Sequence, residues 1–426
     1  MMSNLFKIAI IIFPGTNCHE ESFRAIKNVG LEPEFFRWND DYKKLAKFDG
    51  YFIAGGFSYE DRVRSGAIAG RDPLMNIIKE QAKAGKPVIG ICNGAQILVE
   101  SGLIPGLVEL SSINEYHLGA GLAWNNHGYL NIWTRIKNES APGRCAFNNF
   151  AAGHHFALPI AHGEGRWVVP QDLLKQFQQN GQTVFRYCDE NGEEKEEYPI
   201  NPNGAMYNLA GVCNEAGNVL ALMPHPERTK DGLVIFESMK KYLEEKTINK
   251  VQLTNNLQIP SSSARPNSKP ITNYQKPGNA LEILVDLIIT DNEAQTLQTA
   301  LVGLGYNNVK VKRFTHWEVE TSDQSSEFIA ELIKSGELLN TNKEIPYINQ
   351  NLKLKTKSHN LLVRYKDDFV GQGKRSTLVN RLGFKQIKSI KQGVLWQLEC
   401  SDSDWQKILA SNILANPYSQ DKFLYD

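Results

Sequence analysis

The first 245 residues alternate short apolar runs with amphipathic segments. The runs KIAIIIF, YFIAGG and PVIGIC contain few polar positions, which indicates strands buried on both faces of a parallel sheet. HEESFRAIKNVG and the segment that ends at Lys83 have helical spacing, and the helix LVIFESMKKYLEE closes the pattern. This alternation predicts an α/β domain over residues 1–245 with a doubly wound, mostly parallel sheet. Its active face should lie at the carboxyl ends of the strands.

The composition changes after residue 245. Residues 246–279 are rich in Pro, Ser and Asn and have few large apolar side chains. Such a segment cannot bury enough apolar surface to offset the entropy lost on ordering. We therefore predict a flexible linker there.

An internal repeat follows the predicted linker. LVGLGYNNVKVKRFTHWEVETSD aligns with LVNRLGFKQIKSIKQGVLWQLECSD, and Trp317 matches Trp396. Each copy has the pattern strand, helix, strand, strand, helix. We predict two small α+β domains, residues 280–350 and 351–426, which pair as a pseudo-symmetric module and act as an adaptor, and a duplicated domain without a function of its own is the alternative.

Charge and cysteine content narrow the cellular setting. Lys plus Arg and Asp plus Glu number 47 each, so no net field favours nucleic acid or an anionic membrane as a partner. The six cysteines form no C-x-x-C pair, which is typical of reduced thiols. The apolar start LFKIAIIIFPG is too short to span a membrane and lacks a signal-peptide cleavage site. We expect a cytoplasmic protein with no nucleic-acid or membrane partner.

The segment KPVIGICNGAQILVESG places Cys92 between Gly90 and Gly94, where a strand pattern gives way to a helical one. A tight strand-to-helix turn projects the side chain at its tip, as in the nucleophile elbow of hydrolases. A helix N-terminus also stabilises a thiolate. We therefore predict that Cys92 is a nucleophile, and a buried structural cysteine is the alternative.

The motif MPHPER supplies a base for this thiol. His225 and Glu227 are two residues apart, and Pro224 and Pro226 disfavour helix, so both side chains should lie on one face. His225 would act as general base and acid, and the Glu227 carboxylate would orient the imidazole. The alternative for His225 is a core or surface histidine without a catalytic role.

Two segments could stabilise an oxyanion. YFIAGGFSYED ends a strand at Gly55 and Gly56, where bare backbone can approach a ligand closely. One N–H from this loop and the N–H of Asn93 would form an oxyanion hole. Phe57 and Gln96, in the same two segments, join the predicted oxyanion and substrate-binding set. The alternative is a Gly-Gly that only makes a turn.

Four motifs together carry a family resemblance. GGFSYED, GICNGAQ, PIAHGEGR and MPHPER, in this order, resemble the class I glutamine amidotransferases, and most closely the PurQ-like glutaminase of phosphoribosylformylglycinamidine synthase. The resemblance covers about residues 5–245. It implies that Cys92 attacks the side-chain amide of L-glutamine, with His225 and Glu227 completing a triad. The family usually has glycine where this chain has Glu60.

The resemblance also implies partners. Ammonia would pass to a separate synthetase that amidates formylglycinamide ribonucleotide in purine biosynthesis, with ATP and Mg bound on that partner and no cofactor or metal in this chain. The repeated region resembles the PurS-like subunit that bridges glutaminase and synthetase. His162 and Glu164 of HGEG would contact substrate, and a turn with a solvated glutamate is the alternative.

Two other functions are compatible with the patterns. One is a cysteine hydrolase or peptidase of related α/β fold, and the other is a non-catalytic regulatory protein that binds a small ligand through the repeats. The HPE and HGEG motifs favour the amidotransferase over the first. The complete triad argues against the second.

Overall fold

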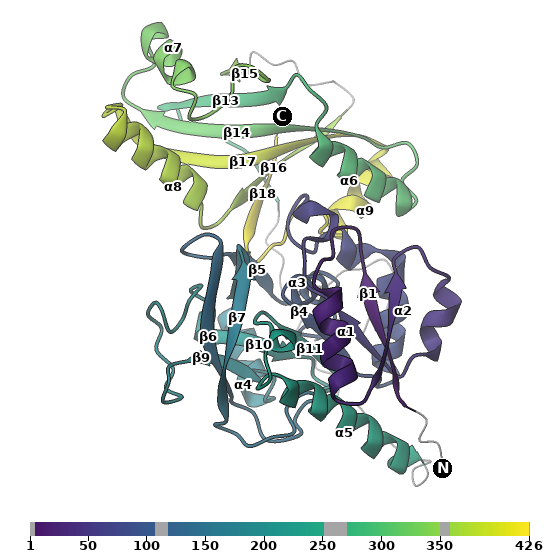
Figure 1. Cartoon of the computed structure of the whole chain (residues 1–426). Helices are drawn as coiled ribbons and strands as arrows, with labels where there is room; N and C mark the ends of the chain where they lie inside the picture. The colour runs from purple at the N-terminus through teal and green to yellow at the C-terminus, as the bar shows by residue number, and fades with distance from the viewer. Residues whose placement is uncertain (1–4, 107–117, 251–270, 350–357, 426) are drawn as a thin grey trace. The chain divides into compact units, whose positions relative to one another are not determined.

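The computed structural model describes residues 5–106, 118–250, 271–349 and 358–425 (Figure 1). The chain divides into two compact units, residues 1–266 and 267–426. Within the described ranges, no helix has both the length and the apolar character needed to cross a membrane.

The first unit is built on a sheet with the strand order β2-β1-β3-β4-β11-β10-β9-β6-β7. Its strands are β1 (Lys7–Ile12), β2 (Glu32–Arg37), β3 (Gly50–Ile53), β4 (Val88–Ile91), β6 (Leu130–Asn138), β7 (His155–His162), β9 (Phe185–Cys188), β10 (Leu209–Cys213) and β11 (Val219–Leu222). A separate antiparallel pair consists of β5 (Gly121–Trp124) and β8 (Glu164–Val168).

The half of the sheet from β2 to β11 is parallel, as the apolar runs predict. Its helices are α1 (His19–Asn28), α2 (Pro73–Lys83), α3 (Asn93–Glu100) and the closing helix α5 (Leu233–Lys250). The crossover from β1 to β2 runs in the opposite direction to that from β3 to β4. Because both crossovers are expected to be right-handed, α1 and α2 belong on opposite faces. This arrangement is the predicted doubly wound one.

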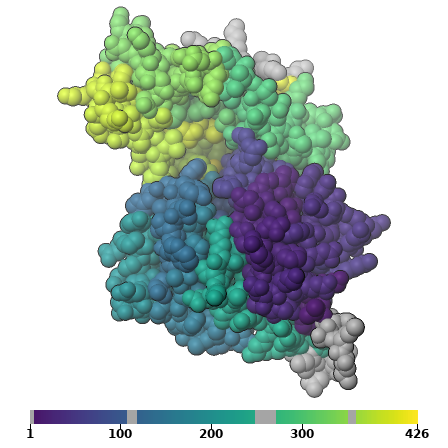
Figure 2. Space-filling model, in the orientation of Figure 1, coloured from purple at the N-terminus to yellow at the C-terminus, as the bar shows by residue number. Residues whose placement is uncertain are grey.

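The other half of the sheet corrects the prediction of a mostly parallel sheet. The neighbours among β11, β10, β9, β6 and β7 are all antiparallel. A tight turn containing Asn214 and Gly217 joins β10 to β11, and so short a connection can only pair strands antiparallel. The helix α4 (Gln171–Gln179) precedes β9. Figure 2 shows one face of this unit, with purple residues from the start of the chain and blue residues that follow them on either side of a teal segment.

Short helical turns complete the first unit. They are η1 (Tyr42–Lys47), η2 (Ser58–Asp61), η3 (Ala69–Arg71), η4 (Met206–Asn208) and η5 (Pro226–Arg228). Both η2 and η5 follow the carboxyl ends of central strands, so they lie where the predicted site residues are.

The second unit has a sheet with the order β12-β18-β16-β17-β14-β13-β15. Its strands are β12 (Thr272–Asn273), β13 (Ala280–Leu287), β14 (Lys310–Thr321), β15 (Glu344–Ile348), β16 (His359–Tyr365), β17 (Ile387–Glu399) and β18 (Gln420–Leu424). Its helices are α6 (Asn292–Gly303), α7 (Ser326–Lys334), α8 (Phe369–Ser376), the adjoining η6 (Thr377–Arg381) and α9 (Asp402–Ala410).

The two copies of the repeat have the same order of elements, but not the predicted one. Each copy is strand, helix, strand, helix, strand, because KVKRFTHWEVET forms the single strand β14 instead of two. This segment contains no glycine or proline and is rich in β-branched and aromatic residues, so nothing in it starts a turn. β14 pairs antiparallel with its counterpart β17, which joins the copies into one sheet.

Both ends of the predicted linker are structured. The helix α5 continues to Lys250, and β12 pairs with β18 in the second unit. The linker predicted over 246–279 is therefore too long at both ends, and its residues 251–270 lie outside the described ranges. A short polar segment does not reveal from its composition that a distant strand pairs with it.

Candidate active site

Cys92 occupies a strained turn between β4 and α3. Its backbone has φ +52° and ψ −109°, a conformation unfavourable for a residue with a side chain. A Cβ on Gly94 would overlap the carbonyl oxygen of Ile53, and one on Gly90 would overlap Gly94 itself. The two glycines are thus required for the close approach of helix and sheet. The strand, turn and helix predicted around Cys92 are confirmed.

His225 and Glu227 contact each other directly. Nδ1 of His225 lies 2.6 Å from Oε1 of Glu227, and both side chains are buried. The backbone N–H of His225 donates to the carbonyl of Pro159 in β7, which fixes its position. The chain turns into η5 at Pro226 instead of remaining extended, yet the two side chains meet as predicted. Nε2 of His225 forms no hydrogen bond with any residue that the structure describes.

Cys92, His225 and the glycine loop surround one point. A Cβ on Gly55 would lie 3.2 Å from Cε1 of His225 and 3.4 Å from Cβ of Cys92. It would also lie 3.2 Å from Sγ of Cys18. Segments far apart in the sequence therefore converge at the carboxyl ends of the parallel strands, where a doubly wound sheet places its site.

The charged groups around His225 favour the protonated form of its imidazole. Burial opposes the charged form of His225, but the negative charges of Glu227 and Cys92 outweigh burial and raise the pKa of His225 to about 10. His225 therefore holds a proton at neutral pH. A protonated imidazole beside a cysteine stabilises the thiolate, which is the nucleophilic form.

Cys18 is a second thiol at the site, which the sequence patterns did not single out. Its Sγ accepts a hydrogen bond from Arg228 at 3.2 Å and donates one to Oδ1 of Asn17 at 3.1 Å. Burial, together with nearby negative charges, raises the pKa of Cys18 to about 12 despite Arg228. No local pattern marks Cys18, which reaches the site because it follows the carboxyl end of β1, next to β3 in the sheet.

The glycine loop is shaped for close backbone contact. Gly56 has φ +143°, and a Cβ there would lie 2.7 Å from the backbone nitrogen of Asn17. The N–H of Phe57 donates to the carbonyl of Gly15 at 3.0 Å, so it is not available to an oxyanion. This corrects the prediction for Phe57, which offers the site only its exposed ring.

Asn93 and Gln96 lie on the first turn of α3. As the first residue of the helix, Asn93 has a backbone N–H with no acceptor inside the helix. Gln96 is buried, its Nε2 donates to the carbonyl of Glu164 at 2.5 Å, and its Oε1 accepts from Asn93 at 2.8 Å. Both ends of the Gln96 amide thus connect parts of the protein, which favours a scaffold role over the predicted substrate contact.

His162 and Glu164 are both buried, so the alternative of a solvated turn is wrong. Burial and the positive charge of His225 lower the pKa of His162 to about 3, which keeps its imidazole neutral. Burial and the charge of Asp61 raise the pKa of Glu164 to about 8, so its carboxyl is largely protonated at neutral pH. Nε2 of His162 forms no hydrogen bond within the described part of the chain.

Exposed aromatic side chains lie beside the HGEG segment. A Cβ on Gly163 would lie 3.4 Å from the ring of Trp124 and 3.8 Å from that of Tyr129. Burial and the negative charge of Cys92 raise the pKa of Tyr129. Both rings are more than a third exposed, so they form an apolar rim next to the site. No sequence motif singles out these two rings.

The part of the chain that contains these residues is similar to known proteins. Residues 6–256 match the family of CobB/CobQ-like glutamine amidotransferase domains. The chain is 42% identical over 261 residues to phosphoribosylformylglycinamidine synthase subunit PurQ of Methanothrix thermoacetophila, covering 56% of this chain and 99% of that protein. The chain belongs to the PurQ family of glutamine amidotransferases.

Other PurQ proteins match over a similar span. The PurQ subunit of Aquifex aeolicus is 42% identical over 242 residues, covering 55% of this chain and 98% of that protein. Among solved structures, a chain in "Structure of PurLQS from Thermotoga maritima" matches with 32% identity and a TM-score of 0.45, covering 56% of this chain and 99% of that one. The family match includes nearly all of the first unit and ends before the second begins.

Proposed function

We propose that this chain is the glutaminase component of phosphoribosylformylglycinamidine synthase. It hydrolyses L-glutamine to glutamate and ammonia, and a separate synthetase uses the ammonia to convert formylglycinamide ribonucleotide to its amidine. Membership of the PurQ family supports this function over that of a related cysteine peptidase. The observation that carries the proposal is the convergence of Cys92, His225 and Gly55 on one point.

The first half of the reaction forms a thioester. The Cys92 thiolate attacks the side-chain amide carbon of glutamine, and the carbonyl oxygen becomes an oxyanion. His225 then gives its proton to the amide nitrogen, the carbon–nitrogen bond breaks, and ammonia leaves. Glu227 stabilises the imidazolium before this transfer and holds the ring in place throughout.

The second half hydrolyses the thioester. Nε2 of His225 takes a proton from water, which attacks the thioester carbon and forms a second oxyanion. Collapse of that intermediate releases glutamate and restores the thiolate, with His225 protonated again. One N–H from the Gly55–Gly56 loop and the N–H of Asn93 stabilise both oxyanions, which is the role that we assign to these glycines.

The HGEG segment has a supporting role in this account. His162 stays neutral beside the positively charged His225, and Glu164 stays protonated, so neither adds charge to the pocket at neutral pH. We propose that they shape the glutamine pocket from the β7–β8 side. The exposed ring of Phe57 would contribute apolar surface to the same pocket.

We further propose that the second unit is a fused PurS-like pair that recruits the synthetase. The two copies join across β14 and β17, and Arg364 of the second copy contacts Glu318 of the first at 3.0 Å. A Cβ on Gly393 would lie 2.9 Å from Cγ of Arg364, so this glycine lets the arginine cross β17. Lys391 also contacts Glu318, at 3.0 Å. The buried Arg364–Glu318 pair supports a fixed pairing of the copies. ATP and Mg would bind the synthetase, and the enzyme would act in the cytoplasm.

Glutamate release tests the proposed reaction. The full-length chain, mixed with a synthetase subunit of phosphoribosylformylglycinamidine synthase, its ribonucleotide substrate and ATP, should release glutamate from L-glutamine. Cys92→Ala should release none, and a thioester should form only with Cys92 present. Peptide hydrolysis without glutamine hydrolysis would contradict the proposal and support the peptidase.

A further inference from the structure

The loop that follows the glycine pair is held in an unfavourable conformation. Tyr59, Glu60, Asp61 and Val63 have φ of 51°, 56°, 54° and 69°, although none of them is glycine. The left-handed region is costly for residues with a Cβ, and most of all for a β-branched residue such as Val63. Contacts from outside the loop must therefore hold it in this shape.

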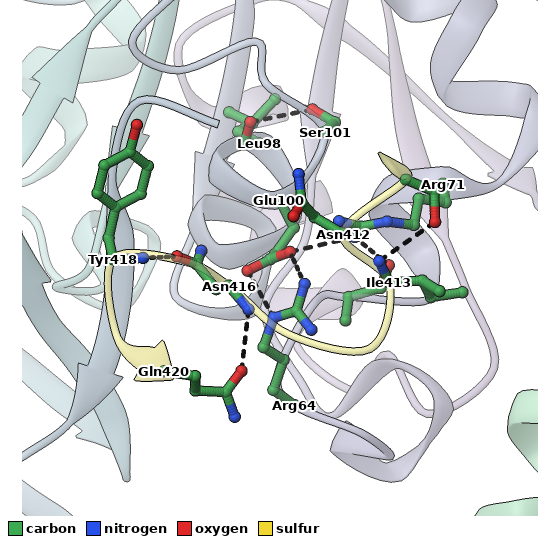
Figure 3. Close-up of polar contacts among 12 residues, drawn as sticks. Arg64, Arg71, Leu98, Glu100, Ser101, Asn412, Ile413, Asn416, Tyr418 and Gln420 are labelled. Atoms are coloured by element: carbon green, nitrogen blue, oxygen red, sulfur yellow. Dashed lines mark hydrogen bonds and ion pairs between the residues drawn. The ribbon is translucent and has the colours of Figure 1, made fainter. Parts of the chain in front are cut away.

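The far end of the loop is anchored by a buried carboxylate at the end of α3. Nε and Nη2 of Arg64 lie 2.9 Å and 2.5 Å from the two oxygens of Glu100. Nη1 of Arg71 donates to the same carboxylate at 3.1 Å, as Figure 3 shows. This anchor ties the end of the loop to the helix that carries the nucleophile at its other end.

The near end of the loop is held by the side chain of Asn93. Its Oδ1 accepts the backbone N–H of Ser58 at 3.0 Å. Its Nδ2 donates to Oδ1 of Asp61 at 3.3 Å and to Oε1 of Gln96 at 2.8 Å. The Asn93 side chain is fully buried, so water does not compete for these contacts. Both polar atoms of one amide thus bind the loop.

We propose that Asn93 and Asp61 form a clamp that sets the spacing between the two halves of the oxyanion hole. The inference rests on the proposed function. Asn93 contributes its backbone N–H to one half of the hole, while its side chain holds the loop whose glycines form the other half. The side chain of Asn93 and Asp61 are therefore positioning residues for glutamine hydrolysis.

The spacing of the two N–H donors matters because both must lie within hydrogen-bond distance of the oxygen that becomes negatively charged during the reaction. Donors act on an oxyanion at 2.7–3.1 Å, and a misplacement of about 1 Å can cost roughly a hundredfold in rate. The oxyanion exists only in the transition state and intermediates, so a loosened clamp should lower kcat with little change in KM. The chemistry of the thiolate itself should not change, since His225 does not contact the clamp through any hydrogen bond in the described residues.

The loop offers a matched pair of substitutions. Asp61→Gly and Glu60→Gly both place glycine at a left-handed position, so both relieve strain and loosen the backbone equally. Only the first removes a clamp contact, because the exposed Glu60 bonds to Arg62 at the surface. For Asp61→Gly we expect kcat for glutamine hydrolysis to fall by about tenfold to a hundredfold, with KM changed by less than about threefold. Glu60→Gly should keep both constants within about twofold of the parent chain.

A donor–acceptor exchange tests the contact itself. Asn93→Asp keeps an oxygen for the Ser58 N–H but sets two carboxylates against each other, and should lower kcat at least as much as Asp61→Gly. Adding Asp61→Asn places an amide donor at position 61 opposite the carboxylate at position 93. The pair then has one carboxylate, as in the parent chain. The kcat of the double variant should exceed that of Asn93→Asp alone by about tenfold or more. The two single variants and the double variant form a double-mutant cycle, which separates the contact between residues 93 and 61 from the contact that residue 93 makes with Gln96.

Two further readouts separate the possible failures. The rate of Cys92 alkylation by iodoacetamide should be the same in the parent chain, Asp61→Gly and Glu60→Gly, since it reports the reactivity of the thiol and not the oxyanion hole. Equal kcat for Asp61→Gly and Glu60→Gly, or no recovery in the double variant, would overturn the clamp. An inactive parent chain in the presence of its synthetase would instead overturn the proposed function. Thermal melting of each variant excludes loss of fold as the cause.

Discussion

Nδ1 of His225 lies 2.6 Å from Oε1 of Glu227, with both side chains buried. Because the carboxylate raises the pKa of His225 and orients its ring, Glu227→Gln should lower kcat by about a hundredfold, near the lower end of what general acid–base catalysis contributes. The amide keeps a hydrogen-bond partner but removes the charge. Glutamate release under saturating glutamine measures the effect. If Glu227→Gln were as inactive as Cys92→Ala, Glu227 would do more than orient the imidazole.

Glu164 makes a pH-dependent contribution to stability. Its pKa is raised from 4.5 to about 8 by burial and the charge of Asp61, so the folded state holds a proton that the unfolded state has lost. Above pH 4.5 this difference progressively lowers the free energy of unfolding, and the decrease is complete once the pH passes about 8. Glu164→Gln should therefore gain melting temperature relative to the parent chain as pH rises through this window. A constant difference between the two chains would contradict the raised pKa.

The two thiols at the site should differ in reactivity. Burial raises the pKa of Cys18 to about 12, so it remains a thiol at neutral pH. Cys92 lies beside His225, whose pKa is raised to about 10, and a neighbouring imidazolium makes a cysteine more reactive. Limited treatment with iodoacetamide at neutral pH should label Cys92 and leave Cys18 unlabelled, as peptide mass mapping would show. Comparable labelling of Cys18 in the folded chain would mean that its surroundings do not suppress ionisation.

The second unit should matter for recruitment and not for thioester chemistry. A chain that ends at residue 266 retains the complete first unit. Curated PurQ relatives are matched over 98–99% of their length by just over half of this chain, which supports independent folding. The truncated chain should be folded and react with iodoacetamide normally, yet co-elute poorly with the synthetase, because a tethered adaptor raises effective concentration. Full co-elution with an unchanged glutamine-dependent rate would refute the adaptor role.

Much of the site could be predicted because its chemistry is local in the sequence. The glycines around Cys92 predict a tight turn, and the two-residue spacing of His225 and Glu227 predicts that their side chains meet. The structure has both features. The parallel half of the sheet was also predictable, since strands buried on both faces read as continuous apolar runs.

The remaining features depend on contacts between distant segments. Cys18 reaches the site only because β1 and β3 are neighbours in the sheet, and the N–H of Phe57 is occupied because Gly15 lies opposite it. The left-handed residues from Tyr59 to Asp61 have no local sequence signal, because glycine or asparagine would normally mark such positions. In each case tertiary contacts determine the conformation.

Cys92 should produce ammonia for a partner that uses it. The most direct measurement compares glutamine-dependent with ammonia-dependent amidation of formylglycinamide ribonucleotide by the synthetase mixed with the parent chain or with Cys92→Ala. Cys92→Ala should abolish the glutamine-dependent rate and leave the ammonia-dependent rate unchanged, since the thiolate makes ammonia but does not consume it. Equal loss of both rates, or an unimpaired glutamine-dependent rate, would contradict this role of Cys92.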